Sequence, residues 1–109
     1  MRRIVMATMS ALAFVAAATT ASAQDGAKVY ADQKCSTCHS IGGKGNTKGP
    51  LDGIGSKMTA DEIRQWIVDP VAMTAKAKAT RKPVMAAKYG SLPKPELDAL
   101  VTYLASLKK

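Results

Sequence analysis

The sequence predicts a small all-α domain, and three observations lead to that fold class. Three segments carry apolar residues at helical spacing, whereas runs of alternating β-branched residues, which are typical of strands, are almost absent. Of the 109 residues, 47% are hydrophobic and 22% are charged, which excludes a disordered chain and leaves room for one domain. The only long apolar stretch lies at the N-terminus, which excludes a multi-pass membrane protein.

Residues 1–23 are typical of a cleaved Sec signal peptide. Met1-Arg2-Arg3 is a short positive region, an uncharged apolar run follows it, and Ala21-Ser22-Ala23 is a small-x-small cleavage site. Cleavage would leave residues 24–109 as the mature domain. A single membrane anchor is the alternative, but the run is rich in Ala and Thr and only weakly apolar. We therefore expect export to the periplasm and no stable membrane insertion after cleavage.

The first expected helix runs from about Gly26 to Cys38. Asp25 is its expected N-cap, because a short carboxylate there can accept a bond from a free backbone N–H. Ala27, Tyr30 and Ala31 recur at helical spacing.

The second expected helix opens with a capping box at Thr59 and Glu62, in which each residue satisfies a free backbone N–H of the other. Its apolar stripe consists of Ile63, Trp66 and Ile67. It should end at Asp69-Pro70, because the residue before a proline disfavours the helical conformation.

The third expected helix runs from about Lys94 to Leu107, with Pro95 tolerated in its first turn. Its amphipathic stripe consists of Leu97, Leu100, Val101, Leu104 and Leu107. Between the helices we expect loops, including a glycine-rich segment over residues 42–55 and a segment rich in Ala, Lys and Thr from Val71 to Lys82.

The only two cysteines and the only histidine form one motif, Cys35-Ser36-Thr37-Cys38-His39. C-x-x-C-H is the attachment signature for c-type haem. At this spacing the thiols of Cys35 and Cys38 can form thioethers with the two haem vinyl groups, and the His39 imidazole lies beneath the iron as the proximal ligand. A chain this short buries little apolar surface, so one covalently bound haem c would also complete its core.

Other interpretations of the motif are weaker. Cys35 and Cys38 would form a disulfide in an oxidising compartment, or act as a thioredoxin-like redox pair. A thioredoxin-like pair normally opens a helix after a strand, and no β-rich segment precedes Cys35. A zinc site needs four ligands, and the chain has two Cys and one His.

The sixth iron position would need a second ligand, and bis-histidine ligation is excluded because His39 is the only histidine. Three methionines of residues 24–109 are candidates: Met58, Met73 and Met85. Met85 follows a flexible segment and precedes the last helix, and Pro83 stiffens its approach. The alternative is that Met85 only fills the core, which is the commonest role of methionine.

Five motifs occur in an order that resembles one family: the haem pentapeptide, Gly49–Gly55, Trp66–Pro70, the Met85 segment and Ala99–Leu104. Together they look like class I cytochrome c, the small bacterial monohaem type, over nearly all of residues 24–109. The resemblance implies the small cytochrome c fold, with three to five helices wrapped around one covalently attached haem.

The resemblance also implies roles near the iron. His39 would be the proximal ligand and Met85 the distal one, with Met73 as the main rival. The carbonyl of Pro50 would accept the His39 ring N–H and raise the basicity of the imidazole. One departure matters, because the family usually places Pro directly after the distal Met, whereas Ala86 follows it here. The bond from Met85 to iron is therefore expected to be weaker than usual.

Further packing follows from the resemblance. The first helix would cross the last one, with Gly26 allowing close approach and Tyr30 lying near Tyr103. Trp66 would lie near the haem edge, toward a propionate, or else simply belong to the core stripe of its helix.

The expected function is electron transfer rather than enzymatic catalysis. With both axial positions filled, no open site remains for a substrate, and no second catalytic set is available once the only Cys and His residues are used. Two alternatives stay open: a cytochrome subunit of a dedicated periplasmic oxidoreductase complex, and a ligand-binding haem protein with a labile sixth site.

The positive charge suggests the kind of partner. The formal net charge is +8, and a patch of lysines around the haem edge would attract redox proteins with acidic docking surfaces. The residues expected in such a patch are Lys44, Lys48, Lys57, Lys76, Lys78, Arg81, Lys82 and Lys88. The alternative is a solvated surface that keeps a small protein soluble. No nucleic-acid-binding motif accompanies the charge, so nucleic acid is not an expected partner.

Overall fold

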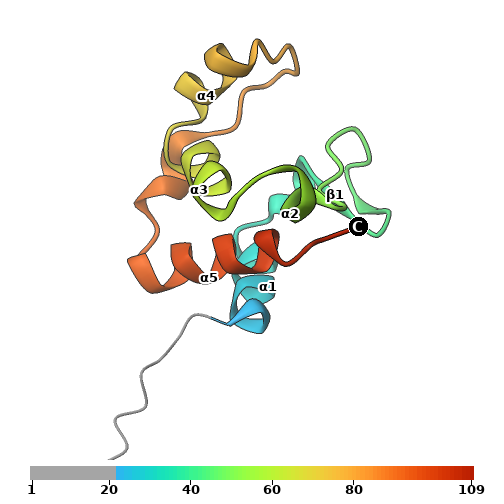
Figure 1. Ribbon diagram of the computed structural model, residues 1–109, viewed down its shortest axis with the longest axis vertical. Coiled ribbons are helices and arrows are strands. Elements are labelled where there is room, and N and C mark those ends of the chain that lie inside the picture. The colour runs from blue at the N-terminus through green and yellow to red at the C-terminus, as the bar shows by residue number, and fades with distance from the viewer. Residues whose placement is uncertain (1–21) are drawn as a thin grey trace, which may run out of the picture.

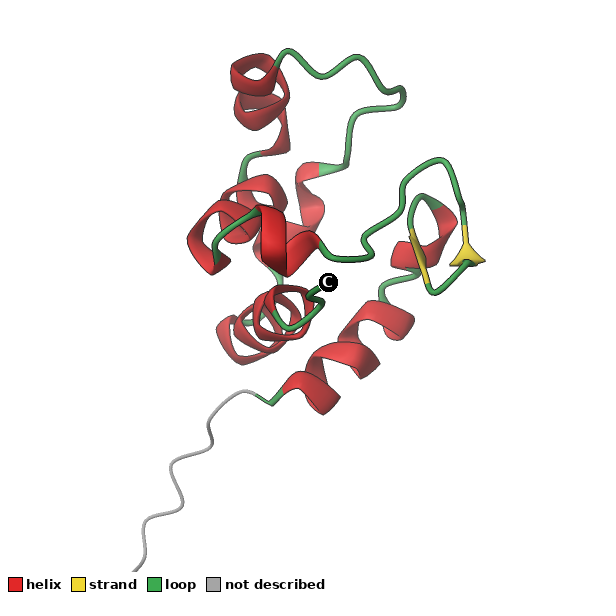
Figure 2. Ribbon diagram, turned by 45° about the vertical axis from the view of Figure 1, so that its right-hand side comes forward, coloured by secondary structure: helices red, strands yellow, loops and turns green. Residues whose placement is uncertain are grey.

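The computed structural model describes residues 22–109, and the expected signal peptide lies outside them except for Ser22 and Ala23. The fold is all-α, as predicted (Figure 1). Its helices are α1 (Ala23–Asp32), α2 (Ile54–Lys57), α3 (Ala60–Val68), α4 (Pro70–Ala77) and α5 (Lys94–Ala105), with short 3₁₀ turns η1 (Cys35–Thr37) and η2 (Ala87–Ser91). The only strands in the described part are β1 (Ser40–Ile41) and β2 (Lys44–Gly45), which pair antiparallel (Figure 2). No helix in this range is long and apolar enough to cross a membrane.

Helix α1 crosses α5, and this is the most extensive contact between two elements (Figure 1). Gly26 is buried at the crossing, where a Cβ atom would lie 2.0 Å from the carbonyl oxygen of Ala99. The rings of Tyr30 and Tyr103 meet edge to face, with their centroids 6.0 Å apart. The expected crossing, the close approach at Gly26 and the Tyr30–Tyr103 contact are all confirmed.

The hydrophobic core joins α1, α3 and α5. Its buried members are Val29, Ile63, Ile67, Leu97, Leu100, Val101 and Leu104. Six of these seven lie on the stripes that the sequence predicts for α3 and α5, and Leu100 is only 1% exposed. Apolar side chains at i, i+3 and i+4 gather on one face of a helix, so the two stripes meet across α3 and α5.

Helix α1 differs from the expected first helix at both ends. It begins at Ala23 with Ser22 as N-cap, because the Ser22 hydroxyl accepts a bond from the Asp25 N–H at 3.2 Å. It ends at Asp32 and does not reach Cys38, so that prediction was wrong. Lys34 takes a left-handed conformation, with φ of 56°, which stops the helix before the haem motif.

The segment after α3 also differs from expectation. Thr59 and Glu62 form the expected capping box, and Asp69 ends α3. Asp69 then caps a further helix, α4, by accepting the Ala72 N–H at 3.2 Å, with Pro70 in the first turn. Residues 70–77 were expected to lie mainly in a loop, and this is wrong because proline stops one helix while fitting the start of the next.

The C-terminal residues fold back over α2. Helix α5 ends at Ala105, two residues before the predicted end, and Leu107 accepts a hydrogen bond from the Gly55 N–H at 2.8 Å. Ser56 exchanges two hydrogen bonds with the backbone of Lys109. The missed helix α2 is therefore held between the glycine-rich segment and the end of the chain.

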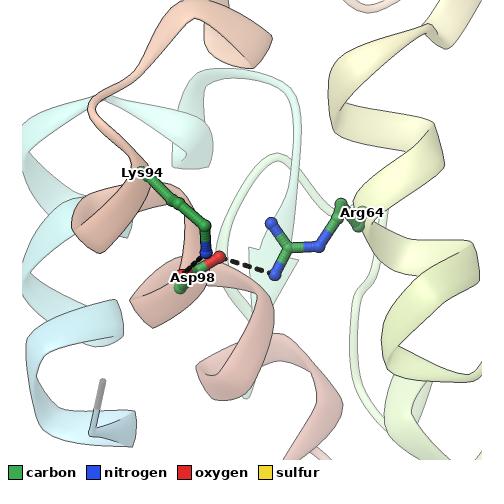
Figure 3. Close-up of polar contacts among 3 residues, drawn as sticks. All are labelled: Arg64, Lys94 and Asp98. Carbon is green, nitrogen blue, oxygen red and sulfur yellow. Dashed lines mark hydrogen bonds and ion pairs between the residues drawn. The ribbon is translucent and has the colours of Figure 1, made fainter. Parts of the chain in front are cut away.

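An ion pair connects α3 to α5 on the surface (Figure 3). Arg64 Nη2 lies 2.7 Å from Asp98 Oδ1, although the pair lacks the alignment of a hydrogen bond. Lys94 Nζ donates to Asp98 Oδ2 at 2.6 Å from one turn earlier on α5. These cations, Lys94 first and then Arg64, hold the pKa of the Asp98 carboxyl below its usual range.

Candidate haem-binding site

The haem motif lies on a single 3₁₀ turn between α1 and the short hairpin. The Cys35 carbonyl accepts bonds from the backbone N–H of Cys38 at 3.1 Å and of His39 at 3.0 Å. This turn brings both thiols and the imidazole onto one short piece of backbone. Both cysteines are free thiols; Cys35 is half-buried and Cys38 is exposed.

The thiols do not resemble a thioredoxin-like redox pair. Burial raises the pKa of the Cys35 thiol, and the neighbouring Cys38 raises it further, against a lowering by a backbone hydrogen bond. Reactive cysteines of that kind have a lowered pKa, because the thiolate is the nucleophile. The element before the motif is helix α1, whereas in a thioredoxin-like site it is a strand.

The His39 imidazole is half-buried and held by the backbone of Gly49. Its Nδ1 lies 3.0 Å from the Gly49 carbonyl oxygen. Because a carbonyl oxygen only accepts, Nδ1 carries the proton and Nε2 keeps a free lone pair. Burial lowers the pKa of His39, the bond to Gly49 opposes this, and the positive charge of Arg81 lowers it further. A neutral imidazole with a free Nε2 is suited to binding iron.

The acceptor of this bond differs from the expected one. The Pro50 carbonyl was expected to accept the His39 ring N–H, and the structure gives that position to Gly49. A short backbone bridge pairs Ser40 with Pro50, in which the Ser40 N–H donates to Gly49 and the Leu51 N–H donates to Ser40. This register turns the Gly49 carbonyl toward His39. Pro50 is thus one residue away from the contact.

The loop between the motif and Gly49 is held by several bonds to the motif backbone. The Asn46 N–H is shared between the carbonyls of Ser36 and His39, both at 3.0 Å, and the Asn46 amide reaches Thr37. Gly45 has a φ of 105°, and a Cβ there would lie 2.3 Å from the His39 carbonyl oxygen. Glycines were expected in this loop, but the roles of Asn46, Gly45 and Gly49 are not apparent from the sequence.

Burial alone does not identify which of the three candidate methionines is the iron ligand, because all three are half-buried. Met85 and Met58 are half-buried and pack against the hydrophobic core, while Met73 is half-buried on α4 and is not among the residues packed there. Trp66 lies half-buried on α3, also outside the core cluster.

One contact brings the Met85 segment to the haem motif. Arg81, four residues before Met85, donates from Nη2 to the Cys38 carbonyl oxygen at 2.5 Å. No comparable hydrogen bond within residues 22–109 connects the segments around Met58 or Met73 to Cys35–His39. From the sequence, Arg81 was expected only as one of the surface charges around the haem edge.

The cations expected around the haem edge are exposed in the structure. Four of them lie in loops, Lys48, Lys78, Arg81 and Lys82, whereas Lys44 belongs to β2, Lys57 to α2, Lys76 to α4 and Lys88 to η2. Residues 70–95 contain no Asp or Glu. We call five cations of this segment the basic arm: Lys76, Lys78, Arg81, Lys82 and Lys88.

Comparison with known proteins identifies the family. The family model described as Cytochrome c matches residues 23–108. No curated protein and no solved structure matches the chain. Members of this family carry covalently attached haem c and transfer electrons, and two free thiols in Cys-x-x-Cys-His spacing beside an imidazole with a free Nε2 fit that group. With this fold and this match over most of its length, the chain belongs to the cytochrome c family.

Proposed function

We propose that the protein is a periplasmic one-electron carrier whose haem has His39 and Met85 as axial ligands. Cys35 and Cys38 form the two thioethers. When bound, haem c supplies reversible one-electron chemistry, and the protein sets its ligands and surroundings. The observation that carries the axial assignment is the Arg81 contact, because it brings the Met85 segment next to the backbone that carries His39.

The backbone around His39 favours a fixed proximal ligand. The Gly49 carbonyl orients the ring through Nδ1 and is itself bonded to the Ser40 N–H at 3.1 Å. An imidazole held in this way keeps one tautomer and one ring orientation in both oxidation states, which suits electron transfer with little rearrangement.

Two axial side chains leave no position for a substrate, so we propose a carrier and not an enzyme. A carrier that serves many partners and a subunit dedicated to one periplasmic oxidoreductase share all of these features. Co-purification with a larger enzyme would identify the second.

One feature of the structure supports the alternative of a labile sixth site, namely the few hydrogen bonds of the segment that carries Met85. Within residues 22–109, no backbone hydrogen bond outside helices and strands involves residues 80–86. Ala86 stands after Met85, where proline would stiffen the chain. A ligand on a weakly held loop is displaced more easily than one on a rigid loop.

The test is the far-red spectrum of the oxidised, haem-loaded protein made in a host that attaches haem. The charge-transfer band from methionine sulfur to ferric iron should be present in wild type and absent in Met85→Ala. Met73→Leu and Met58→Leu are the matched controls, and both should retain the band. Loss of the band in Met73→Leu alone would assign the ligand to Met73, and a wild type that lacks the band and binds carbon monoxide when reduced would establish an open sixth site.

Export is a separate part of the proposal. We propose that residues 1–23 are a Sec signal peptide and that residues 24–109 are the mature domain. The match to the family begins at Ala23, which supports this boundary. Cleavage there removes the Ser22 cap of α1 and leaves Asp25 to accept the free N–H groups. The intact mass of the protein from a periplasmic extract tests the boundary, and the uncleaved mass in the membrane fraction would indicate an anchor.

We further propose that the mature protein docks to redox partners with acidic surfaces, without stable membrane insertion and without nucleic acid. The basic arm supports this, since all five of its cations are exposed and its segment has no acidic residue. Such a charge distribution raises the association rate with an anionic surface in a salt-dependent way.

A further inference from the structure

Arg81 contacts the backbone at two positions next to His39, at Cys38 and at Gly49. Its Nη2 donates to the carbonyl oxygen of Cys38, the residue directly before His39, across 43 positions of sequence. Its guanidinium also lies on the backbone of Gly49, where a Cβ atom would be 2.1 Å from Arg81 Nη1 and 2.7 Å from Cζ. Gly49 is the residue that orients the His39 ring. A side chain from the segment that carries Met85 therefore contacts two backbone positions next to His39: Cys38, which precedes it, and Gly49, which binds its ring.

The segment that carries Met85 has little else to hold it. Among residues 22–109, the bond from Arg81 is the only hydrogen bond, from side chain or loop backbone, that involves residues 80–86. Residues 80–83 and Ala86 are exposed, and only Val84 and Met85 are half-buried. Segments with few buried contacts and few hydrogen bonds open at low free-energy cost.

The chemistry of the contact suits a tether. A guanidinium is always charged and presents a rigid fork of donors, so a single Arg can bond one carbonyl and lie flat on neighbouring backbone. Its charge makes the bond to Cys38 stronger than a neutral one. A lysine has one flexible ammonium and cannot reproduce both contacts. The absence of a side chain at Gly49 is what leaves room for the guanidinium.

We propose that Arg81 is a positioning residue that ties the Met85 segment to the haem motif and so sets how firmly Met85 occupies the distal position. This inference rests on the proposed axial role of Met85. It goes beyond that role, because it assigns the strength of the distal bond to a residue that touches neither the iron nor the sulfur.

The test measures how easily a neutral competitor displaces Met85. Imidazole is titrated into the oxidised, haem-loaded protein, and the far-red band reports the remaining methionine ligation. Arg81→Gln should raise the apparent imidazole affinity about 5- to 30-fold, which corresponds to the loss of one or two kcal/mol of tethering. Arg81→Lys keeps the charge but loses the fork, and it should also raise the affinity.

Lys28→Gln is the matched control, because it removes one exposed positive charge from α1 and should leave the affinity within twofold of wild type. Circular dichroism of each variant checks that the helices are retained. If both Arg81 variants stay within twofold of wild type while the wild type shows the far-red band, the tether is wrong and the Met85 ligation stands. If Arg81→Gln alone weakens ligation, the effect is one of charge, and the positioning role is also overturned. A wild type without the band refutes Met85 ligation itself, together with this inference.

Discussion

The backbone of Gly26 on α1 lies directly against Ala99 on α5, with no room for a side chain between them. A Cβ atom at Gly26 would lie 2.0 Å from the Ala99 carbonyl oxygen and 2.4 Å from the Cβ of Tyr103. Since the first of these neighbours is backbone, no side-chain rotation could relieve the overlap, and the two helices would have to separate.

The first prediction concerns this crossing. Gly26→Ala should lower the free energy of unfolding by about 1–3 kcal/mol, the usual cost of overpacking a close contact, despite the better helix propensity of alanine. Thermal unfolding of the haem-loaded protein measures this. Lys28→Ala, at an exposed position of the same helix, should change stability little. A Gly26→Ala protein as stable as wild type would show that α1 and α5 can move apart freely.

The second prediction concerns the Tyr30 hydroxyl, which is buried and has no hydrogen-bond partner among the described residues. Burial raises the pKa of Tyr30, and the nearby Cys35, Tyr103 and Asp52 add to this. An unsatisfied buried hydroxyl costs about 1–3 kcal/mol, so Tyr30→Phe should be at least as stable as wild type and keep the edge-to-face contact with Tyr103. Chemical denaturation with a Tyr103→Phe comparison tests it, and a clear loss of stability only in Tyr30→Phe would refute it.

The third prediction is a pH dependence that comes from Asp98. Lys94 and Arg64 lower the pKa of this carboxyl in the folded protein, so its contribution to stability is present above its unfolded pKa of about 3.8. The contribution is lost as the pH falls through the lower, folded-state pKa. Asp98→Asn should therefore lower the melting temperature at neutral pH, and the difference from wild type should disappear in strong acid.

The control for Asp98 is Asp32→Asn, at the exposed end of α1, where no ion pair occurs within residues 22–109. It should not lower the melting temperature at neutral pH. An Asp98→Asn penalty that stays constant from neutral to strongly acidic pH would mean that packing, and not the charge of Asp98, stabilises this junction.

The fourth prediction concerns the basic arm. Oxidation of the reduced protein by hexacyanoferrate(III), an anionic probe, should be about threefold slower or more at low salt in Lys76→Gln/Lys82→Gln than in wild type. Stopped-flow rates at rising ionic strength should converge, because salt screens exposed charges. The charge-matched Lys28→Gln/Lys108→Gln protein should be affected less. Equal slowing in both proteins would mean that the rate depends only on net charge, and that the basic arm is not a preferred site of contact with the anionic probe.

Local signals in the sequence account for much of the fold. The stripes of α3 and α5, apart from Trp66 and Leu107, and the Thr59–Glu62 capping box depend on spacings of three or four residues, and the structure confirms them. The close approach at Gly26 came instead from the family resemblance, because one glycine in a helix has no distinctive local pattern.

The misses come from long-range geometry or from signals with two meanings. Pro70 both ends α3 and starts α4, and only the end was read from the sequence. The choice of Gly49 over Pro50 depends on the bridge to Ser40, which no local pattern encodes. The Arg81 contact spans 43 positions, and an exposed arginine in a basic segment gives no sign of its partner.

The crossing of α1 and α5 has a consequence for the order of folding. These helices stand at opposite ends of the described chain, so the core closes only when its last segment has been synthesised. Chain entropy is lost when such distant segments are brought together, and this loss slows folding. Cys35 and Cys38 directly follow α1 and emerge long before α5. In a nascent chain, the two thiols are therefore exposed on unfolded backbone before α5 has emerged. The core closes only once α5 is available to pack against α1.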